Sequence, residues 1–125
     1  THLFPGTLSL LEKLKKQYRL HIITNGFEQV QQKKMENSGI AGFFDVVLTA
    51  EKAGIKKPDS AIFKQALSLA ASTPQKALMI GDSYEADIAG ALTLGMQAIH
   101  FNSHEEPLHE HCLVVNSLGV IEEYL

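Results

Sequence analysis

Two aspartates stand where a buried strand is expected to give way to a helix. The segment GDSYEADIAGA, residues 81–91, follows the apolar run KALMI and places Asp82 and Asp87 five positions apart. The helix dipole favours an acidic residue in a first helical turn, but it does not account for Asp82 in the turn before the helix. With Asp82 in that turn and Asp87 in the first helical turns, both carboxylates can reach one point, and Mg²⁺ accepts such oxygen ligands. The pair is therefore predicted to hold a divalent cation.

A second candidate for chemistry is the triplet Thr24, Asn25 and Gly26, which follows the apolar residues LHII. The hydroxyl of Thr24 and the backbone amides at a glycine turn before a helix make a small cradle for an anion. Threonine and asparagine are also preferred helix N-caps, and on its own the triplet favours that structural role.

Lys57 is the third candidate and stands directly before Pro58 in the loop KKPD. Most loop lysines are solvated, and the alternative is a point charge for a phosphate oxygen. The proline restricts the backbone of Lys57, so the direction of its side chain is definable.

The hydrophobic pattern predicts the elements that position these residues. Strands are expected at 20–24, 45–50, 76–80, 97–101 and 112–116. Helices are expected at 5–18, at about 27–38, after a cap at Asp59 or Ser60, at 85–94 and from about 118. Their apolar positions are Leu8, Leu11 and Leu14, then Phe27, Val30 and Met35, then Ile62, Phe63, Ala66, Leu67 and Ala70.

Short apolar strands that alternate with helices are typical of a parallel sheet covered on both faces. The predicted fold is thus a three-layer, Rossmann-like α/β domain that takes up residues 1–125. Ligands bind such sheets at the carboxyl ends of the strands. Thr24, Lys57 and Asp82 are accordingly expected to converge at one edge of the sheet.

Composition excludes several classes of protein. The chain of 125 residues carries a formal charge of −3 and no basic stripe, which argues against a nucleic-acid partner. No apolar run has the length of a membrane span, so no membrane partner is expected either. The single cysteine, Cys112, leaves no internal disulfide and indicates a cytoplasmic protein. A dinucleotide site is disfavoured because G-x-G-x-x-G is absent.

Together, IITNG, the KKPD lysine and GDSYEAD make the chain resemble the haloacid dehalogenase-like hydrolases from about residue 5 to 102. The surrounding sequence looks most like the branch that includes pyrimidine 5′-nucleotidases. The resemblance implies a Mg²⁺-dependent phosphatase that acts through an aspartyl-phosphate on a small phosphorylated metabolite or nucleotide. It also implies that Thr24, Asn25, Gly26 and Lys57 bind phosphate, that Lys57 is catalytic, and that Asp82 and Asp87 bind the metal.

One motif of the family has no match in this sequence. The family's D-x-D-x-[T/V] supplies the nucleophile, whereas the aspartates here are Asp45, Asp59, Asp82 and Asp87, no two of which are separated by one residue. The chain is therefore expected to be the C-terminal part of a longer hydrolase and to be inactive alone. The alternative is a non-catalytic α/β module that binds phosphate or a nucleotide.

The resemblance implies that the absent first-motif strand would lie between the strands that end at Thr24 and Ile80. Unpaired buried backbone groups cost about 1–3 kcal/mol each, so this gap is expected to be closed. Direct pairing of the two strands is the simplest expectation, and strand donation by a second copy would make a dimer.

The segment HEEPLHEHC, residues 104–112, is rich in potential metal ligands but lacks the HExxH pattern. Pro107 breaks any helix that would align His104 with His109. A solvated loop is the favoured interpretation, and Cys112 is expected to be a buried small residue rather than a nucleophile.

Overall fold

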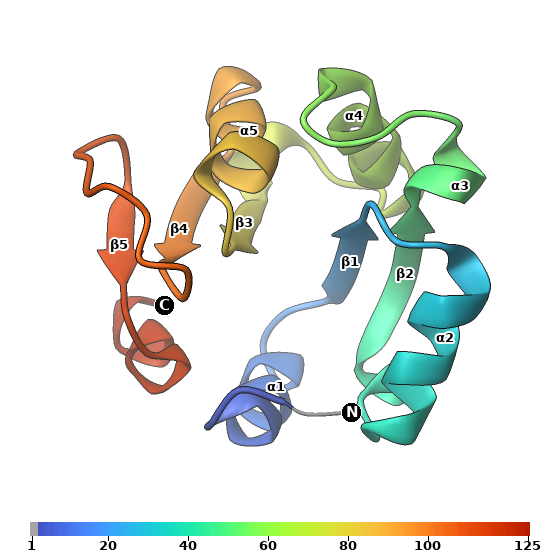
Figure 1. Cartoon of the computed structure of the whole chain (residues 1–125), viewed down its shortest axis with the longest axis horizontal. Coiled ribbons are helices and arrows are strands. Elements are labelled where there is room, and N and C mark those ends of the chain that lie inside the picture. The colour runs from blue at the N-terminus through green and yellow to red at the C-terminus, as the bar shows by residue number, and fades with distance from the viewer. Residues whose placement is uncertain (1–2) are drawn as a thin grey trace.

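The computed structural model describes residues 3–125, in which helices alternate with short parallel strands (Figure 1). The strands are β1 (Leu20–Thr24), β2 (Phe44–Thr49), β3 (Leu78–Gly81), β4 (Gln97–Phe101) and β5 (Leu113–Val115). The α-helices are α1 (Thr7–Lys15), α2 (Glu28–Asn37), α3 (Ala50–Ala53), α4 (Ser60–Leu69) and α5 (Ala89–Thr93). A π-helical turn, Tyr84–Ile88, leads into α5, and 3₁₀ turns span Ala41–Phe43, Pro74–Lys76 and Leu118–Tyr124. The predicted elements are present, but the helix expected at 85–94 begins as the π-helical turn, and the last element is a 3₁₀ rather than an α-helix.

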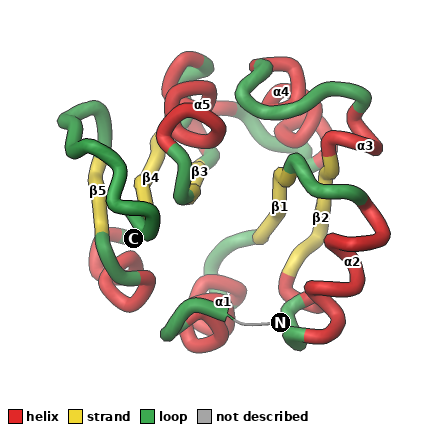
Figure 2. Tube along the Cα trace, viewed as in Figure 1, coloured by secondary structure: helices red, strands yellow, loops and turns green. Residues whose placement is uncertain are grey.

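The strands form two parallel sheets, as Figure 2 shows in yellow. β1 pairs with β2, and β4 lies between β3 and β5. The prediction that β1 and β3 pair directly is therefore wrong for the part of the chain that the structure describes. The four apolar residues expected to line the gap are half-buried, namely Ile22, Ile23, Leu78 and Met79.

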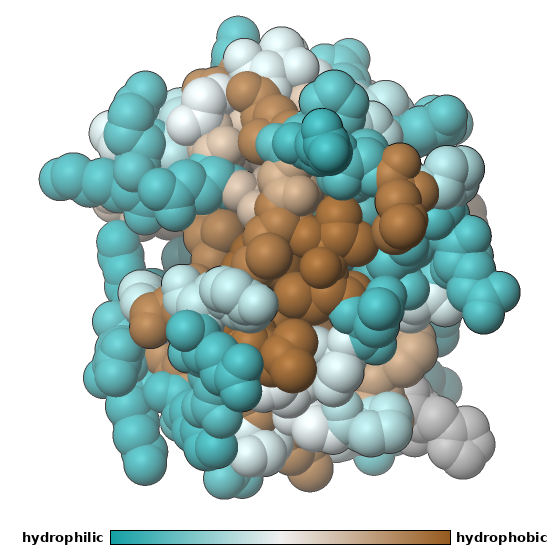
Figure 3. Space-filling model, turned by 90° about the vertical axis from the view of Figure 1, so that its left-hand side faces the viewer, coloured by the Kyte–Doolittle hydropathy of each residue, from teal (hydrophilic) through white to brown (hydrophobic). Residues whose placement is uncertain are grey.

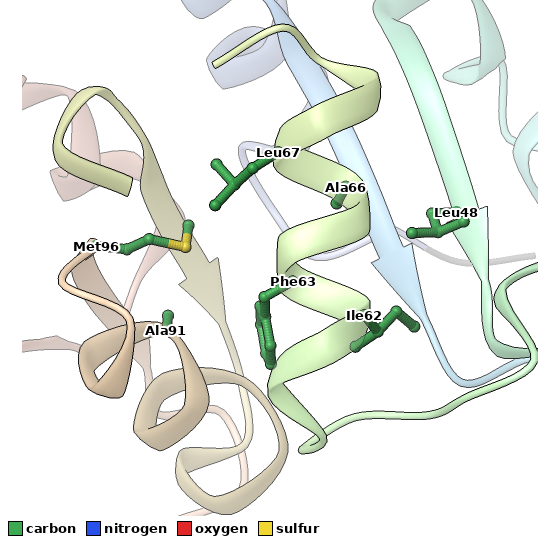
Figure 4. Close-up of a cluster of buried hydrophobic side chains, with 7 residues drawn as sticks. All are labelled: Leu48, Ile62, Phe63, Ala66, Leu67, Ala91 and Met96. Atoms are coloured by element: carbon green, nitrogen blue, oxygen red, sulfur yellow. The ribbon is translucent and has the colours of Figure 1, made fainter. Parts of the chain in front are cut away.

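A layer of helices on one face joins the two sheets. Figure 4 shows α4 between Leu48 of β2 and the segment that carries Ala91 and Met96. Ile23 of β1 and Met79 of β3 both pack against this cluster, whose buried members are Leu48, Ile62, Phe63, Ala66, Leu67, Ala91 and Met96. Full burial of a side chain such as Phe63 stabilises the fold by about 1.5–3 kcal/mol. β1 and β3 are thus held in one domain by helix packing and not by backbone pairing.

The opposite face is covered by α1 and the 3₁₀ turn at the C-terminal end. Its cluster consists of Leu10, Leu14, Ile99, Phe101, Val115 and Ile121, and Leu20 of β1 and Ile80 of β3 pack against it. Both sheets therefore share both helical layers. The expected α/β fold with helices on each face is confirmed.

Two predicted apolar faces are partly wrong. Leu8 is 44% exposed, because α1 buries Leu10 and Leu14 instead. Phe27 and Val30 are 68% and 52% exposed, and Met35 is the buried residue of α2. The reason is that α2 packs mainly on the 3₁₀ turn at 41–43 and not across a sheet.

β5 forms the outer edge of the three-stranded sheet. Figure 3 views the molecule from the side on which β5 lies in Figure 1, and apolar side chains gather in the middle of this face within a polar surround. Within residues 3–125, no helix combines the length and the hydropathy that crossing a bilayer requires.

Candidate functional site

Hydrogen bonds connect the residue that follows β1 with the loop that carries Lys57. The backbone N–H of Lys57 donates to Asn25 Oδ1 at 2.8 Å, and Asn25 Nδ2 donates to the carbonyl of Lys57 at 3.2 Å. This reciprocal pair fixes the main chain at Lys57 beside the carboxyl end of β1. The Lys57–Pro58 peptide bond in this loop is cis.

The side chain of Lys57 reaches the turn that follows β3. Its Nζ lies 2.5 Å from Oδ1 of Asp87, and the two side chains are only 12% and 4% exposed. The other carboxylate oxygen of Asp87 accepts the backbone N–H of Ser83 at 3.2 Å. Since both charges are shielded from water, removal of either partner would leave an uncompensated buried charge, at a cost of about 3–5 kcal/mol. Lys57 thus links the ends of the two sheets, because Asn25 after β1 binds its main chain and Asp87 after β3 binds its ammonium group.

Asp82 lies at the same turn but takes a different partner. Its Oδ2 is 2.9 Å from Nε2 of His104, and this pair is exposed, with 46% of the Asp82 side chain and 58% of the His104 side chain accessible. Asp87 does not share the contact because its carboxylate is turned toward Lys57 and Ser83. The two aspartates therefore differ in burial and in partner, which their spacing did not reveal.

Gly81 leaves the room that Asp87 needs. A Cβ at position 81 would overlap the carboxylate of Asp87, with Oδ2 only 2.5 Å and Cγ 2.6 Å away. The glycine at the end of β3 is therefore required by the close approach of a site residue.

Gly81→Ala is expected to displace Asp87 and to lower both stability and any activity that depends on Lys57. Overpacking of this kind costs about 1–3 kcal/mol. Gly39→Ala is a control for the loss of stability, because Gly39 follows α2 with a φ of +77°, which strains any other residue, and nothing lies within 4 Å of its new Cβ. Thermal unfolding and steady-state kinetics should show a stability loss in both variants and a fall in kcat in Gly81→Ala alone. An equal fall in kcat in both would contradict a specific role for Gly81.

The triplet at the end of β1 does not cap a helix. The N-cap of α2 is Phe27, which makes no side-chain capping bond, so the favoured N-cap interpretation is wrong. Instead the N–H of Gly26 donates to Thr24 Oγ1 at 3.1 Å. Asn25 uses its side chain to hold Lys57, which gives it a structural role in the site.

The loop after β4 also contributes to this region, and sequence reasoning missed it. Glu106 accepts the backbone N–H of Tyr84 at 3.0 Å, and His104 contacts Asp82.

Among residues 3–125, no group of three histidine, cysteine or acidic side chains is arranged to hold a metal ion. Burial raises the pKa of Cys112, so its thiol stays protonated and unreactive. The only signal in the sequence that the loop after β4 contributes to the site was its unusual density of polar residues.

Comparison with known protein families shows to which family this chain belongs. A family model described as haloacid dehalogenase-like hydrolase matches residues 1–101. The chain belongs to this family. The proposed resemblance is thereby confirmed.

Relatives within the haloacid dehalogenase-like hydrolases include enzymes named for different phosphorylated substrates. Pyrimidine 5′-nucleotidase YjjG of Escherichia coli is 34% identical over 97% of this chain and 56% of its own length. Glyceraldehyde 3-phosphate phosphatase of Methanothermobacter thermautotrophicus is 43% identical over 80% of this chain and 45% of its own length. The structure of HAD-hydrolase YfnB from Bacillus subtilis bound to magnesium has a TM-score of 0.92 at 27% identity, over 98% of this chain and 56% of that one. The chain spans about half the length of the curated relatives that it matches.

The residues at this site have the chemistry that a magnesium ion needs in such a hydrolase. Asp82 offers a half-exposed carboxylate directly after a strand, and Asp87 lies behind it in the following turn. Mg²⁺ is commonly held by one or two carboxylates together with water and substrate phosphate. The chemistry of these two carboxylates fits such an ion, and the carboxylate of Asp82 is the accessible one.

Proposed function

We propose that this chain forms part of the catalytic unit of a phosphomonoester hydrolase that acts through an aspartyl-phosphate. The observation that carries the proposal is the shielded Lys57–Asp87 pair, which Asn25 and Ser83 hold at the junction of the two sheets. A lysine fixed in this way presents a positive charge at the strand ends, where a ligand of this fold binds.

In the proposed reaction, an aspartate oxygen attacks the phosphorus of the substrate while the bond to the leaving oxygen breaks. The leaving oxygen takes up a proton, and water then hydrolyses the aspartyl-phosphate to release inorganic phosphate. Lys57 would offset negative charge on the transferring phosphoryl group, and Thr24 with the amides near Gly26 would contact its other oxygens. Asp87 would hold the ammonium group of Lys57 in place.

In this proposal Asp82 would hold Mg²⁺, whereas both carboxylate oxygens of Asp87 are engaged, one with Lys57 and one with the N–H of Ser83. The ion when bound would supply further positive charge to the phosphoryl oxygens. The structure of a relative bound to magnesium supports Mg²⁺ as the ion.

The nucleophile of the proposed reaction is expected outside this sequence. Asp45 lies in β2 and pairs with Lys15, and Asp59 caps α4, so neither is placed to attack a phosphate beside Lys57. We therefore expect the 125-residue chain alone to release no phosphate from phosphomonoesters. Phosphate release by the purified chain, stimulated by Mg²⁺ and abolished by Asp82→Asn, would contradict this expectation.

The substrate is proposed to be a small phosphorylated metabolite or a nucleotide, and the site of action the cytoplasm. The test is phosphate release by the whole protein from a panel of nucleoside monophosphates and sugar phosphates, with Mg²⁺ and with EDTA. Hydrolysis that requires Mg²⁺ supports the proposal. Binding of these compounds without turnover would instead indicate the alternative, a non-catalytic module for phosphate or nucleotides.

A further inference from the structure

A glutamate from a distant loop holds the beginning of the turn that contains Asp87. Glu106 lies between β4 and β5, and its Oε1 accepts the backbone N–H of Tyr84 at 3.0 Å. Tyr84 is the first residue of the π-helical turn Tyr84–Ile88, and its free N–H is one of those that such a turn leaves without an internal partner. The position of the turn therefore depends on a side chain that comes from another part of the fold.

The main chain at Glu106 is itself fixed to the end of β4. The N–H of Glu106 donates to Asn102 Oδ1 at 2.8 Å, and Asn102 Nδ2 donates to the carbonyl of Glu106 at 3.0 Å. Asn102 is only 9% exposed. Because these bonds involve only the backbone of residue 106, a different side chain there would leave the loop anchored.

His109 and His100 form a row of contacts that ends at the carboxylate of Glu106. The hydrogen bonds along this row fix which ring nitrogens carry a proton. The backbone N–H of His111 donates to Nδ1 of His109, so this ring nitrogen carries no proton. Burial lowers the pKa of His109, and the neighbouring His100 and His111 lower it further, which keeps its ring neutral at neutral pH. The proton of His109 is thus on Nε2, where it donates to Nδ1 of His100 at 3.0 Å.

The proton of His100 is on Nε2, the ring nitrogen that faces Glu106. Its Nδ1 is an acceptor, so the neutral ring carries its proton on Nε2, which lies 3.2 Å from Glu106 Oε1. His100 is fully buried, and its Nε2 makes no regular hydrogen bond among the described residues, so Glu106 is its close polar neighbour. Glu106 therefore faces two N–H groups, one from Tyr84 and one from His100, and both favour a carboxylate or amide oxygen at that point.

We propose that Glu106 is a positioning residue of the hydrolase, which fixes the Tyr84 end of the π-helical turn and thereby sets where Asp87 holds Lys57. The expected effect of Glu106 on catalysis rests on the proposed function. The contact with Tyr84 is independent of that function. Nothing in the proposal requires Glu106 to touch the substrate.

The test compares three variants of the whole protein. Glu106→Ala removes the acceptor, whereas Glu106→Gln keeps an oxygen at the same reach and removes only the charge. Glu110→Ala is a matched control, because Glu110 is an exposed glutamate of the same loop. Hydrogen exchange of the Tyr84 amide, followed by NMR, and kcat for the best substrate of the panel are the two measurements.

Glu106→Ala is expected to accelerate exchange of the Tyr84 amide and to lower kcat about 10-fold, as loss of an outer partner of a site commonly does. Glu106→Gln should restore most of the protection and most of kcat, and Glu110→Ala should match the wild type in both. A global loss of stability would not produce this rescue by glutamine, so the pattern separates positioning from general structural support.

Three outcomes would overturn the proposal. The first is unchanged Tyr84 exchange and unchanged kcat in Glu106→Ala, and the second is a glutamine variant as impaired as the alanine variant. The third is faster exchange without any change in kcat. If the wild-type protein hydrolyses no phosphomonoester, the proposed function fails and so does the effect of Glu106 on kcat. Protection of the Tyr84 amide that depends on Glu106 would still establish the contact itself.

Discussion

Replacing Lys57 with methionine in the whole protein should lower kcat for phosphomonoester hydrolysis by about 10²–10³-fold. Loss of one group that stabilises charge in the transition state typically has an effect of this size. Methionine keeps an unbranched apolar stem, and the backbone bonds between residue 57 and Asn25 do not involve the side chain. Steady-state kinetics with Mg²⁺ at saturation would measure the loss, and a variant that keeps wild-type kcat would rule out a catalytic Lys57.

The same substitution should also destabilise the fold, and this effect has to be separated from the first. Without Lys57, the carboxylate of Asp87 would be buried with no counter-charge, at a cost of about 3–5 kcal/mol. In the double variant Lys57→Met, Asp87→Asn both charges are absent, so most of the stability should return. We expect kcat to stay low in this double variant. Recovery of kcat together with stability would show that Lys57 acts only in folding.

Substitution of the two aspartates of GDSYEAD should have different effects on activity and on stability. Asp82→Asn is expected to reduce activity about 10²-fold at subsaturating Mg²⁺, because a ligand of the ion is lost. Its free energy of unfolding should change little, since an exposed contact such as that between Asp82 and His104 contributes at most about 1 kcal/mol. Activity as a function of Mg²⁺ concentration and calorimetric titration of Mg²⁺ into the protein would measure both the kinetic and the binding effect.

Asp87→Asn provides the contrast on the same segment. It should lower stability far more than Asp82→Asn, because it leaves the shielded ammonium group of Lys57 without its carboxylate. Chemical denaturation of the two variants would compare them directly. If Asp82→Asn proved the more destabilising of the two, the division between an accessible ligand and a buried positioning residue would be wrong.

The order of helices and strands could be predicted from local pattern, and the arrangement of the strands could not. Apolar runs such as LHIIT are long enough to identify a strand, and Asp59 marks the start of α4 by a preference that acts within a few residues. Whether β1 and β3 pair depends on how α4 and α1 pack across both, which no local pattern encodes. For the same reason the exposure of Phe27 and Val30 could not be read from spacing alone.

Within the site, the residue types were predictable and their partners were not. Predicted strand ends pointed to Asn25, Asp82 and Asp87 as candidates, and Lys57 was a candidate as the lysine before Pro58 in the loop KKPD. The structure adds that Asp87 serves Lys57 while Asp82 faces the loop after β4. These contacts join residues 22 to 32 positions apart, and the choice between them depends on the geometry of the turn after Gly81. Glu106 was missed because its partner is a backbone amide, which leaves no trace in the choice of residue at position 84.

Asn25 has a consequence for how proteins of this kind can diverge. Its amide binds only the N–H and the carbonyl of residue 57, groups that almost every amino acid possesses. The backbone of residue 57 is therefore placed without help from its own side chain. During evolution, a new side chain at position 57 would leave the loop in register, but it would require a compensating change at Asp87, whose shielded carboxylate would otherwise lack a counter-charge. Loss of Asn25, by contrast, would displace the loop whatever residues occupied positions 57 and 87.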